Sequence, residues 1–115
     1  MKIPRIIIAG ATSGVGKTSI TCSIIYGLQK HGFSVQPFKV GPDYIDPGYL
    51  SRISKNETYN LDAWLMGEKQ LLHSFTSNSK SSISVIEGVM GYYDGFSGDS
   101  NYASTHHVAS ITKSP

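Results

Sequence analysis

An isoleucine run near the start of the chain leads at once into a stretch rich in glycine and hydroxyl side chains. Residues 6–8 are all isoleucine, and residues 9–18 read Ala-Gly-Ala-Thr-Ser-Gly-Val-Gly-Lys-Thr. Gly14 and Gly16 permit backbone conformations that turn successive N–H groups toward an anion. A buried strand that runs into such a loop and then into a helix predicts a phosphate-binding start, because the free N–H groups of the helix also face the phosphates.

Each residue type in this loop suits a nucleoside triphosphate carrying Mg²⁺. Lys17 supplies a point charge for the β- and γ-phosphates, and the Thr18 hydroxyl is a ligand for Mg²⁺. The strict motif has glycine where Ala11 stands, so the match is a relaxed one. The predicted nucleotide-binding residues are Thr12, Ser13, Gly14, Val15, Gly16, Lys17 and Thr18.

Size and charge narrow the class of protein. A length of 115 residues fits one domain. The net charge is +2 and the basic residues are scattered, so no nucleic-acid partner is expected. The first apolar run is too short for a signal peptide or a membrane span, so no membrane partner is expected either. The single cysteine, Cys22, excludes an internal disulfide and indicates a cytoplasmic protein.

Hydrophobic periodicity predicts alternating strands and helices, which indicates an α/β fold with a mostly parallel sheet and flanking helices. Pro37 is expected at a sheet edge or near the start of its strand. Three strands would leave a parallel edge unpaired, so we expect the front portion of a longer, here truncated, protein. The expected elements are a strand at 6–8, a helix at 17–30, a strand at 34–40, a loop at 41–60, helical pieces at 61–66 and 68–75, a turn at 76–82, a strand at 83–86 and a helix from 104–105 to 112.

Four acidic residues follow predicted strands and should meet at the carboxyl edge of the sheet, where ligands bind in open α/β folds. Glu87 ends the third predicted strand and Asp94 follows it, while Asp43 and Asp46 follow the second. Each is a candidate for a metal or substrate role, and each alone also suits a turn or a helix cap. Lys39, at the end of the second strand, suits either an anionic substrate or plain solvent exposure.

Other residue patterns leave alternatives open or point away from a site. His106 and His107 are neighbours on a helix and diverge by about 100°, so they are not expected to chelate one metal together. Four tyrosines suit either a flat wall for a large conjugated ring or ordinary packing. They are Tyr44, Tyr49, Tyr92 and Tyr93.

Three segments together go beyond a generic phosphate-binding loop. They are residues 9–18, residues 36–48 (Gln-Pro-Phe-Lys-Val-Gly-Pro-Asp-Tyr-Ile-Asp-Pro-Gly) and residues 85–95 (Val-Ile-Glu-Gly-Val-Met-Gly-Tyr-Tyr-Asp-Gly). In order and spacing they resemble the cobyrinic acid a,c-diamide synthases, as do Asn-Leu-Asp-Ala-Trp at 60–64 and Ser-Thr at 104–105. The resemblance spans essentially the whole chain.

The resemblance implies ATP-dependent amidation of the a and c acetate side chains of a corrinoid ring in cobalamin biosynthesis, with glutamine or ammonia as nitrogen donor. ATP would phosphorylate a carboxylate, and ammonia would displace phosphate from the acyl phosphate. The implied cofactors are ATP and Mg²⁺. The implied catalytic residues are Lys17, Asp46, Glu87 and Asp94; the metal ligands are Thr18, Asp43, Asp46 and Glu87; the substrate residues are Lys39, Asp43, Tyr44 and Ile45.

The resemblance also sets expectations for the domain. Residues 1–115 would be the N-terminal part of a P-loop ATP-binding amidoligase domain of the dethiobiotin-synthetase-like fold. A C-terminal glutamine amidotransferase domain is absent from this sequence, so we expect neither glutamine hydrolysis nor appreciable amidation from the chain alone. A homodimer of the longer protein is a further expectation.

Two rival functions stay open at this point. One is a sister enzyme that amidates nickel-sirohydrochlorin, a tetrapyrrole substrate close to cobyrinic acid. The other is a nucleotide-switched partitioning ATPase, although those proteins typically carry lysine where Thr12 stands.

Overall fold

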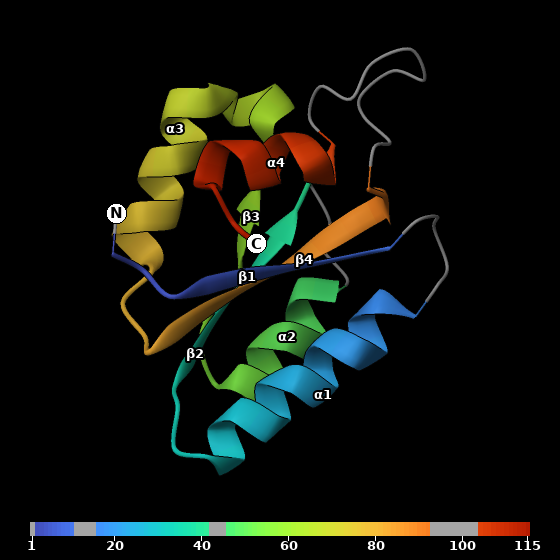
Figure 1. Cartoon of the computed structure of the whole chain (residues 1–115), viewed down its shortest axis with the longest axis vertical. Helices are drawn as coiled ribbons and strands as arrows, with labels where there is room; N and C mark the ends of the chain where they lie inside the picture. The colour runs from blue at the N-terminus through green and yellow to red at the C-terminus, as the bar shows by residue number, and fades with distance from the viewer. Residues whose placement is uncertain (1, 11–15, 42–45, 93–103) are drawn as a thin grey trace.

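The computed structural model describes residues 2–10, 16–41, 46–92 and 104–115, in which strands and helices alternate (Figure 1). The strands are β1 (Arg5–Gly10), β2 (Val35–Val40), β3 (Tyr59–Leu61) and β4 (Ile83–Gly91). The helices are α1 (Lys17–Lys30), α2 (Asp46–Ser54), α3 (Ala63–Asn78) and α4 (Thr105–Thr112). The helices predicted at 17–30 and 105–112 are confirmed.

The four strands form one parallel sheet in the order β1-β4-β2-β3. β4 therefore lies between β1 and β2 and pairs with both. Its register places Glu87 opposite Ile8 on one side and opposite Lys39 on the other. Because the strands are parallel, their carboxyl ends meet at one edge of the sheet. The predicted α/β fold with a parallel sheet is confirmed.

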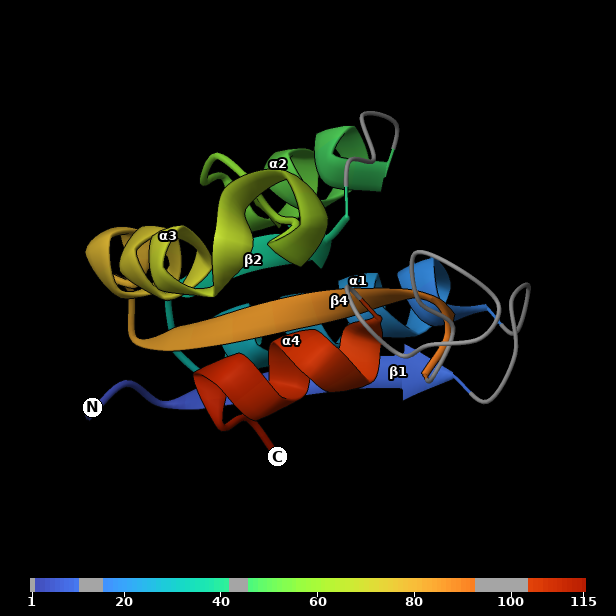
Figure 2. The ribbon, with the colours of Figure 1, turned by 90° about the horizontal axis from the view of Figure 1, so that it is seen from above.

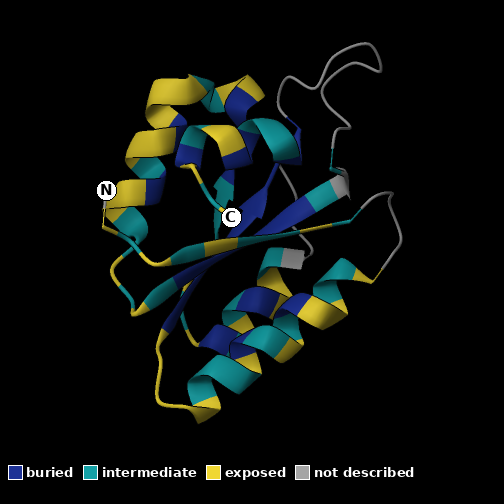
Figure 3. Cartoon of the chain, in the orientation of Figure 1, coloured by how far each residue is buried: buried dark blue, intermediate teal, exposed yellow. Residues whose placement is uncertain are grey.

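Helices cover both faces of the sheet, as Figures 1 and 2 show. α1 and α2 lie on one face, and α3 and α4 lie on the other. Strands covered on both faces are expected to be buried throughout, and every residue of the central strand β2 is buried (Figure 3). The prediction that the first strand is also buried is wrong, because β1 lies at an edge of the sheet and none of its residues is fully buried. The core under α1 and α2 contains Ile25, Val35, Leu50 and Val85. The core under α3 and α4 contains Phe38, Val40, Leu61, Ala63, Leu71, Phe75, Ile86 and Val108.

The prediction of a loop over 41–60 is wrong. This stretch contains α2 and β3, and β3 adds a fourth strand to the three that we expected. Pro47 lies in the first turn of α2, where its missing N–H removes no helical hydrogen bond. Leu50 is fully buried against the sheet. Its burial stabilises α2, although the composition of this stretch alone is typical of a loop.

Three other boundaries also differ from the prediction. Leu61 belongs to β3, so the following helix begins at Ala63 rather than at Leu61. The expected division of this helix into two pieces is confirmed at Gly67, which has φ 79° and ψ 163° inside α3. α3 then continues through Asn78 into the predicted turn, and β4 continues past residue 86 to Gly91.

Pro37 is the third residue of β2, so the prediction that it lies near the start of its strand is confirmed. β2 pairs with β4 as far as Lys39, whereas its pairing with β3 begins only at Phe38. The Glu57 carbonyl, just before β3, instead accepts a hydrogen bond of 2.7 Å from the Gln36 side-chain amide. Pro37 has no backbone N–H to donate to this neighbouring segment. The Gln36 side-chain amide supplies a hydrogen bond to it instead.

The outer edge of β1 meets the last residues of the chain. The Ile7 N–H donates to the Pro115 carbonyl at 3.0 Å, and Arg5 Nε donates to the Thr112 carbonyl at 2.9 Å. The end of α4 is thereby fixed beside the start of β1. None of the described helices is both long enough and apolar enough to span a bilayer.

Candidate nucleotide-binding site

The carboxyl edge of the sheet gathers the described part of the predicted site. α1 begins there, directly after the stretch predicted to bind phosphate, with Gly16 at φ 82° and ψ 28° as its N-cap. This left-handed conformation favours glycine. Lys17 and Thr18 form the first turn of α1 and are half-buried. Of the predicted nucleotide-binding residues, the structure therefore positions these three at a helix N-terminus, as the motif requires.

Several predicted site residues lie outside the described residues. The α2 backbone includes Asp46, but its side chain is not described. The predicted residues that lie wholly outside are Thr12, Ser13, Gly14, Val15, Asp43, Tyr44, Ile45 and Asp94.

The structure brings Lys39 and Glu87 together as a buried ion pair. Lys39 Nζ lies 3.2 Å from Glu87 Oε2, and the two side chains are 3% and 0% exposed. Side chains alternate along a strand, so this pair shares the face of Val35 and Val85, the face that α1 covers. The two residues are direct neighbours in the sheet, but Glu87 lies in the middle of β4, which continues to Gly91, so the prediction that Glu87 ends its strand is wrong. The interpretation of Lys39 as a solvent-exposed lysine is also wrong.

Glu87 has a second oxygen with unused bonding capacity. Among the described residues, Oε1 is buried and has no hydrogen-bond partner. A buried acceptor without a partner costs free energy, and such atoms in native proteins call for an explanation. A carboxylate oxygen is a preferred ligand of Mg²⁺, so Glu87 fits a metal-binding role. Within the described ranges no group of three or more acidic, histidine or cysteine side chains could hold a metal ion.

Gly88 and Thr105 join the end of β4 to the start of α4. The Thr105 hydroxyl accepts a hydrogen bond from the Val89 N–H at 2.9 Å and donates to the Val89 carbonyl at 3.1 Å. A Cβ on Gly88 would lie 2.7 Å from Thr105 Cγ2 and 3.0 Å from the Ile8 carbonyl oxygen. The backbone beside Glu87 is therefore closely packed against two neighbouring segments, α4 and β1. Sequence reasoning read Thr105 as part of a cap and missed this contact, which no local pattern signals.

Asp62 is a second buried carboxylate at this edge, following β3. Its Oδ1 accepts hydrogen bonds from the N–H groups of Trp64 at 3.0 Å and Leu65 at 3.4 Å, which caps α3. Its Oδ2 is buried without a partner among the described residues. The helix predicted from Leu61 includes Asp62, whereas in the structure this aspartate is the N-cap of α3, a position that aspartate commonly takes before a helical pattern.

The histidines and tyrosines near the end of β4 have separate partners. His106 packs against Tyr92 with ring centroids 5.2 Å apart, whereas His107 Nε2 lies 2.9 Å from Glu68 Oε1. The two side chains thus contact different residues, and the expectation that they do not chelate one metal together stays a prediction. Tyr92 is half-buried, and Tyr49 is 54% exposed on α2.

Residues 6–98 match the CobQ/CobB/MinD/ParA nucleotide binding domain, and the chain belongs to that nucleotide-binding family. The order of β1 followed by α1 agrees with this match. Relatives within it share much of the sequence. The chain is 50% identical over 113 residues to the cobyrinate a,c-diamide synthase of Listeria innocua, covering 96% of this chain and 25% of that protein. It is 47% identical over 116 residues to the enzymes of the same name from Leptospira interrogans and Thermoplasma volcanium, covering all of this chain and 26% and 25% of those proteins.

The similarity to the synthases predicted from the three segments is thus confirmed. The chain spans about a quarter of the length of the relatives it matches. No solved structure matches it significantly.

Proposed function

We propose that this chain is the ATP-binding part of a cobyrinate a,c-diamide synthase, which amidates the a and c acetate carboxylates of a corrinoid in cobalamin biosynthesis. The observation that carries the proposal is the Lys39–Glu87 pair. Glu87 Oε1 has no partner among the described residues and lies on the face of the sheet that α1 covers, and α1 begins with Lys17 and Thr18. The names and identities of the relatives support the choice of reaction.

The reaction needs a carboxylate to be activated, since a carboxylate is inert toward amines at neutral pH. Phosphoryl transfer from ATP gives an acyl phosphate, and ammonia then displaces phosphate to form the amide. In this proposal Lys17 and the N–H groups at the start of α1 bind the phosphates and stabilise their charge. Thr18 and Glu87, with Asp43 and Asp46, would hold Mg²⁺, which supplies charge neutralisation on the transferred phosphoryl group.

Substrate positioning rests on the resemblance alone. Asp94, Tyr44 and Ile45 would place the corrinoid, and water must be excluded because it would hydrolyse the acyl phosphate. The resemblance also supports three further parts of the proposal: the N-terminal position of residues 1–115 in the domain, glutamine or ammonia as nitrogen donor, and a homodimer of the longer protein. A cytoplasmic location is supported by the single cysteine.

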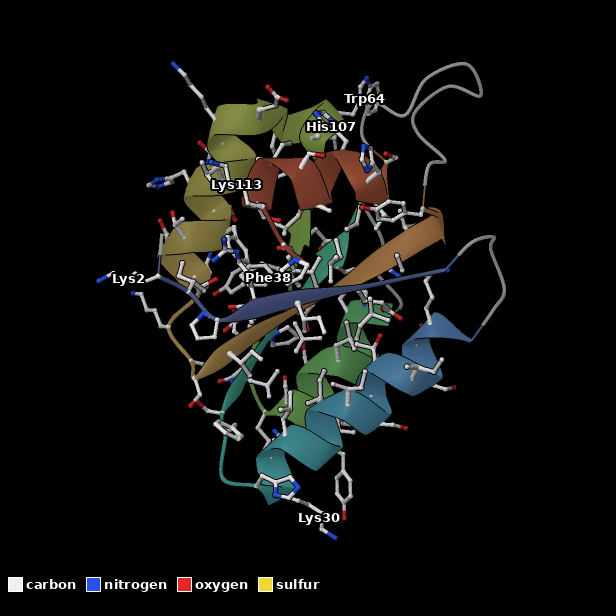
Figure 4. The ribbon with its side chains drawn as sticks, in the orientation of Figure 1. Lys2, Lys30, Phe38, Trp64, His107 and Lys113 are labelled. Atoms are coloured by element: carbon white, nitrogen blue, oxygen red, sulfur yellow. The ribbon has the colours of Figure 1, made fainter. Side chains whose placement is uncertain are left out.

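The nucleotide part of the proposal is tested by calorimetric titration of the chain with Mg²⁺ and ATP. We expect Lys17→Ala to weaken binding at least about tenfold, because it removes the cation nearest the phosphates. Lys30→Ala is a matched control, since Lys30 lies at the opposite end of the same helix, over the Tyr26 ring (Figure 4). Equal affinity of the wild type and the Lys17→Ala variant would contradict the proposal.

The reaction is tested in a chimera in which this chain replaces the matching quarter of the Listeria innocua relative. We expect the chimera to amidate cobyrinic acid with ATP and ammonia, and Lys17→Ala within it to abolish turnover. Amidation of nickel-sirohydrochlorin alone would favour the sister enzyme, whereas nucleotide-dependent dimerisation without tetrapyrrole binding would favour a partitioning-type ATPase.

Glutamine hydrolysis is not expected from the chain alone. Cys22, its single cysteine, lies within α1 and packs against the core cluster of Ile25 and Val35. This packing is typical of a structural cysteine, not of a catalytic nucleophile. Glutaminase activity in the pure chain would refute this expectation.

A further inference from the structure

The Lys39 side chain is held at two points of β4. Its Nζ donates to Glu87 Oε2 at 3.2 Å and to the Gly88 carbonyl at 3.0 Å. The side chain is 3% exposed, so these contacts lie away from water. Because a backbone carbonyl fixes the ammonium group as well as the carboxylate does, the position of Nζ does not depend on Glu87 alone. Lys39 can therefore fix the orientation of the Glu87 carboxylate.

The two oxygens of Glu87 consequently differ. Oε2 accepts the charge-assisted hydrogen bond from Lys39, whereas Oε1 is buried and has no partner among the described residues. A carboxylate in this arrangement has one oxygen committed to a cation of the protein and one oxygen left for a ligand.

We propose that Lys39 is a positioning residue that makes Glu87 a one-oxygen metal ligand, so that the site prefers Mg²⁺ to Ca²⁺. This inference rests on the proposed function, because it assumes that a metal–nucleotide complex binds at this edge of the sheet.

The preference follows from the coordination chemistry of the two ions. Mg²⁺ requires a near-octahedral shell and takes single carboxylate oxygens, whereas Ca²⁺ takes six to eight oxygens and often both oxygens of one carboxylate. With Oε2 held by Lys39, two-oxygen coordination by Glu87 would break a buried ion pair. Groups that hydrogen-bond a ligating carboxylate change metal affinity by about 10- to 100-fold when they are mutated.

An anion-binding role for Lys39 makes a different prediction. If Lys39 served only to bind a substrate carboxylate or phosphate, its removal would weaken the binding of that anion. The ratio of the Mg²⁺ and Ca²⁺ affinities would stay unchanged. Metal selectivity therefore separates the two roles.

The test uses Mn²⁺ as a paramagnetic probe. The chain is loaded with Mn²⁺ and ATP, and the Mg²⁺ and Ca²⁺ concentrations that displace half of the Mn²⁺ are measured by electron paramagnetic resonance. We expect Lys39→Met to reduce the preference for Mg²⁺ about tenfold and Lys39→Arg to retain most of it. Lys69→Met, at an exposed position of α3, is the control for loss of one lysine. An unchanged preference in folded Lys39→Met would overturn the inference.

A second measurement needs no change at Lys39. The chain has three glutamates, Glu57, Glu68 and Glu87, and the first two are exposed. In the double variant Glu57→Gln with Glu68→Gln, Glu87 is the one glutamate left for labelling with ¹³C-glutamate. Infrared difference spectra on addition of Mg²⁺ and ATP should show the widely separated carboxylate bands of one-oxygen coordination. Closely spaced bands, typical of two-oxygen coordination, would overturn the inference even if Lys39→Met fails to fold.

The two levels of failure are distinguishable. If wild-type chain binds no Mn²⁺ with ATP, the proposed nucleotide function falls and the inference falls with it. If Mn²⁺ and ATP bind but selectivity and band spacing contradict one-oxygen coordination, only the role of Lys39 is overturned.

Discussion

At the scale of single residues, the Lys39–Glu87 pair concentrates opposite charges where water does not reach. Removing two charges from water costs several kcal/mol each, and their attraction offsets this only when the geometry is good and the other polar atoms are bonded. The Gly88 carbonyl meets that need for Lys39, whereas Oε1 of Glu87 lacks a described partner. The pair is therefore better suited to binding a ligand than to stabilising the fold.

Breaking the pair on one side should be costly. We expect Lys39→Met to lower the free energy of unfolding by about 3–5 kcal/mol, because Glu87 is left buried without its counter-ion. The double variant Lys39→Met with Glu87→Gln should recover much of that loss, since no buried charge remains. Urea denaturation of both variants checks this, and a double variant as unstable as the single one would contradict it.

Gly88 and Gly27 offer a matched pair of glycine-to-alanine changes. At Gly88 a Cβ would lie 2.7 Å from Thr105 Cγ2, so we expect Gly88→Ala to cost about 1–3 kcal/mol through overpacking.

At Gly27, inside α1, a Cβ meets nothing within 4 Å, and we expect Gly27→Ala to stabilise the chain by up to about 1 kcal/mol. Thermal unfolding of both variants is the measurement. Similar shifts in both variants would contradict the close packing of Gly88 against Thr105.

At the scale of elements, the start of α3 combines a helix cap with a break. Asp62 caps the first turn, and Gly67 interrupts the helix a few residues later with a backbone conformation that residues with a Cβ rarely adopt. Between them Met66 packs on the core, while Trp64 and Leu65 are 53% and 63% exposed (Figure 4). The break lets this first turn follow β3 while the rest of α3 packs along the sheet.

The contribution of Asp62 as a helix cap can be measured separately from the effect of its negative charge. Asp62→Ala should lower the free energy of unfolding by about 1 kcal/mol, because the N–H groups of Trp64 and Leu65 lose their acceptor. Asp62→Asn keeps a capping oxygen and removes a buried charge, so we expect stability equal to the wild type or higher. Chemical denaturation distinguishes the two variants, and a loss in Asp62→Asn as large as in Asp62→Ala would mean that Oδ2 holds a required partner.

How far each element could be predicted depended on how local its cause is. α1 and α4 were predictable because periodic apolar residues and Ser104 as a cap act within a few residues. β3 was missed because its three residues become a strand only by pairing with Phe38 to Val40, some twenty residues away. The side of the sheet for Glu87 was predictable, but its pairing with Lys39 depends on β4 lying beside β2, which no sequence pattern encodes.

At the scale of the whole molecule, Arg5 joins the beginning of the chain to its last helix. Its guanidinium donates to the carbonyls of Thr112 at 2.9 Å, Lys113 at 3.3 Å and Ile3 at 2.7 Å. Carbonyls at a helix C-terminus lack partners within the helix, so a cation there is favourable. Arg5 thus fixes α4, whose other end is tied to β4 by Thr105.

Loss of this tie should loosen α4 selectively. We expect Arg5→Met to speed amide hydrogen exchange across 105–112 by several-fold while α1 keeps its protection, because the lost hydrogen bonds are those to Ile3 and to the end of α4, and none involves α1. Arg52→Met, at an exposed position of α2, removes the same charge and should leave α4 unchanged. Uniform loss of protection in Arg5→Met would show instead that the chain opens as one unit.

The placement of β4 between β1 and β2 has a consequence for biosynthesis. As the ribosome releases the polypeptide, β1 and β2 emerge early, yet the strand that must separate them, with Ile6 opposite Val85 and Val35 opposite Ile83, comes dozens of residues later. Until then the two strands lack their proper neighbour, and direct pairing between them would be a trap that has to be undone. The native order of the sheet can therefore be completed only after the central strand has been translated.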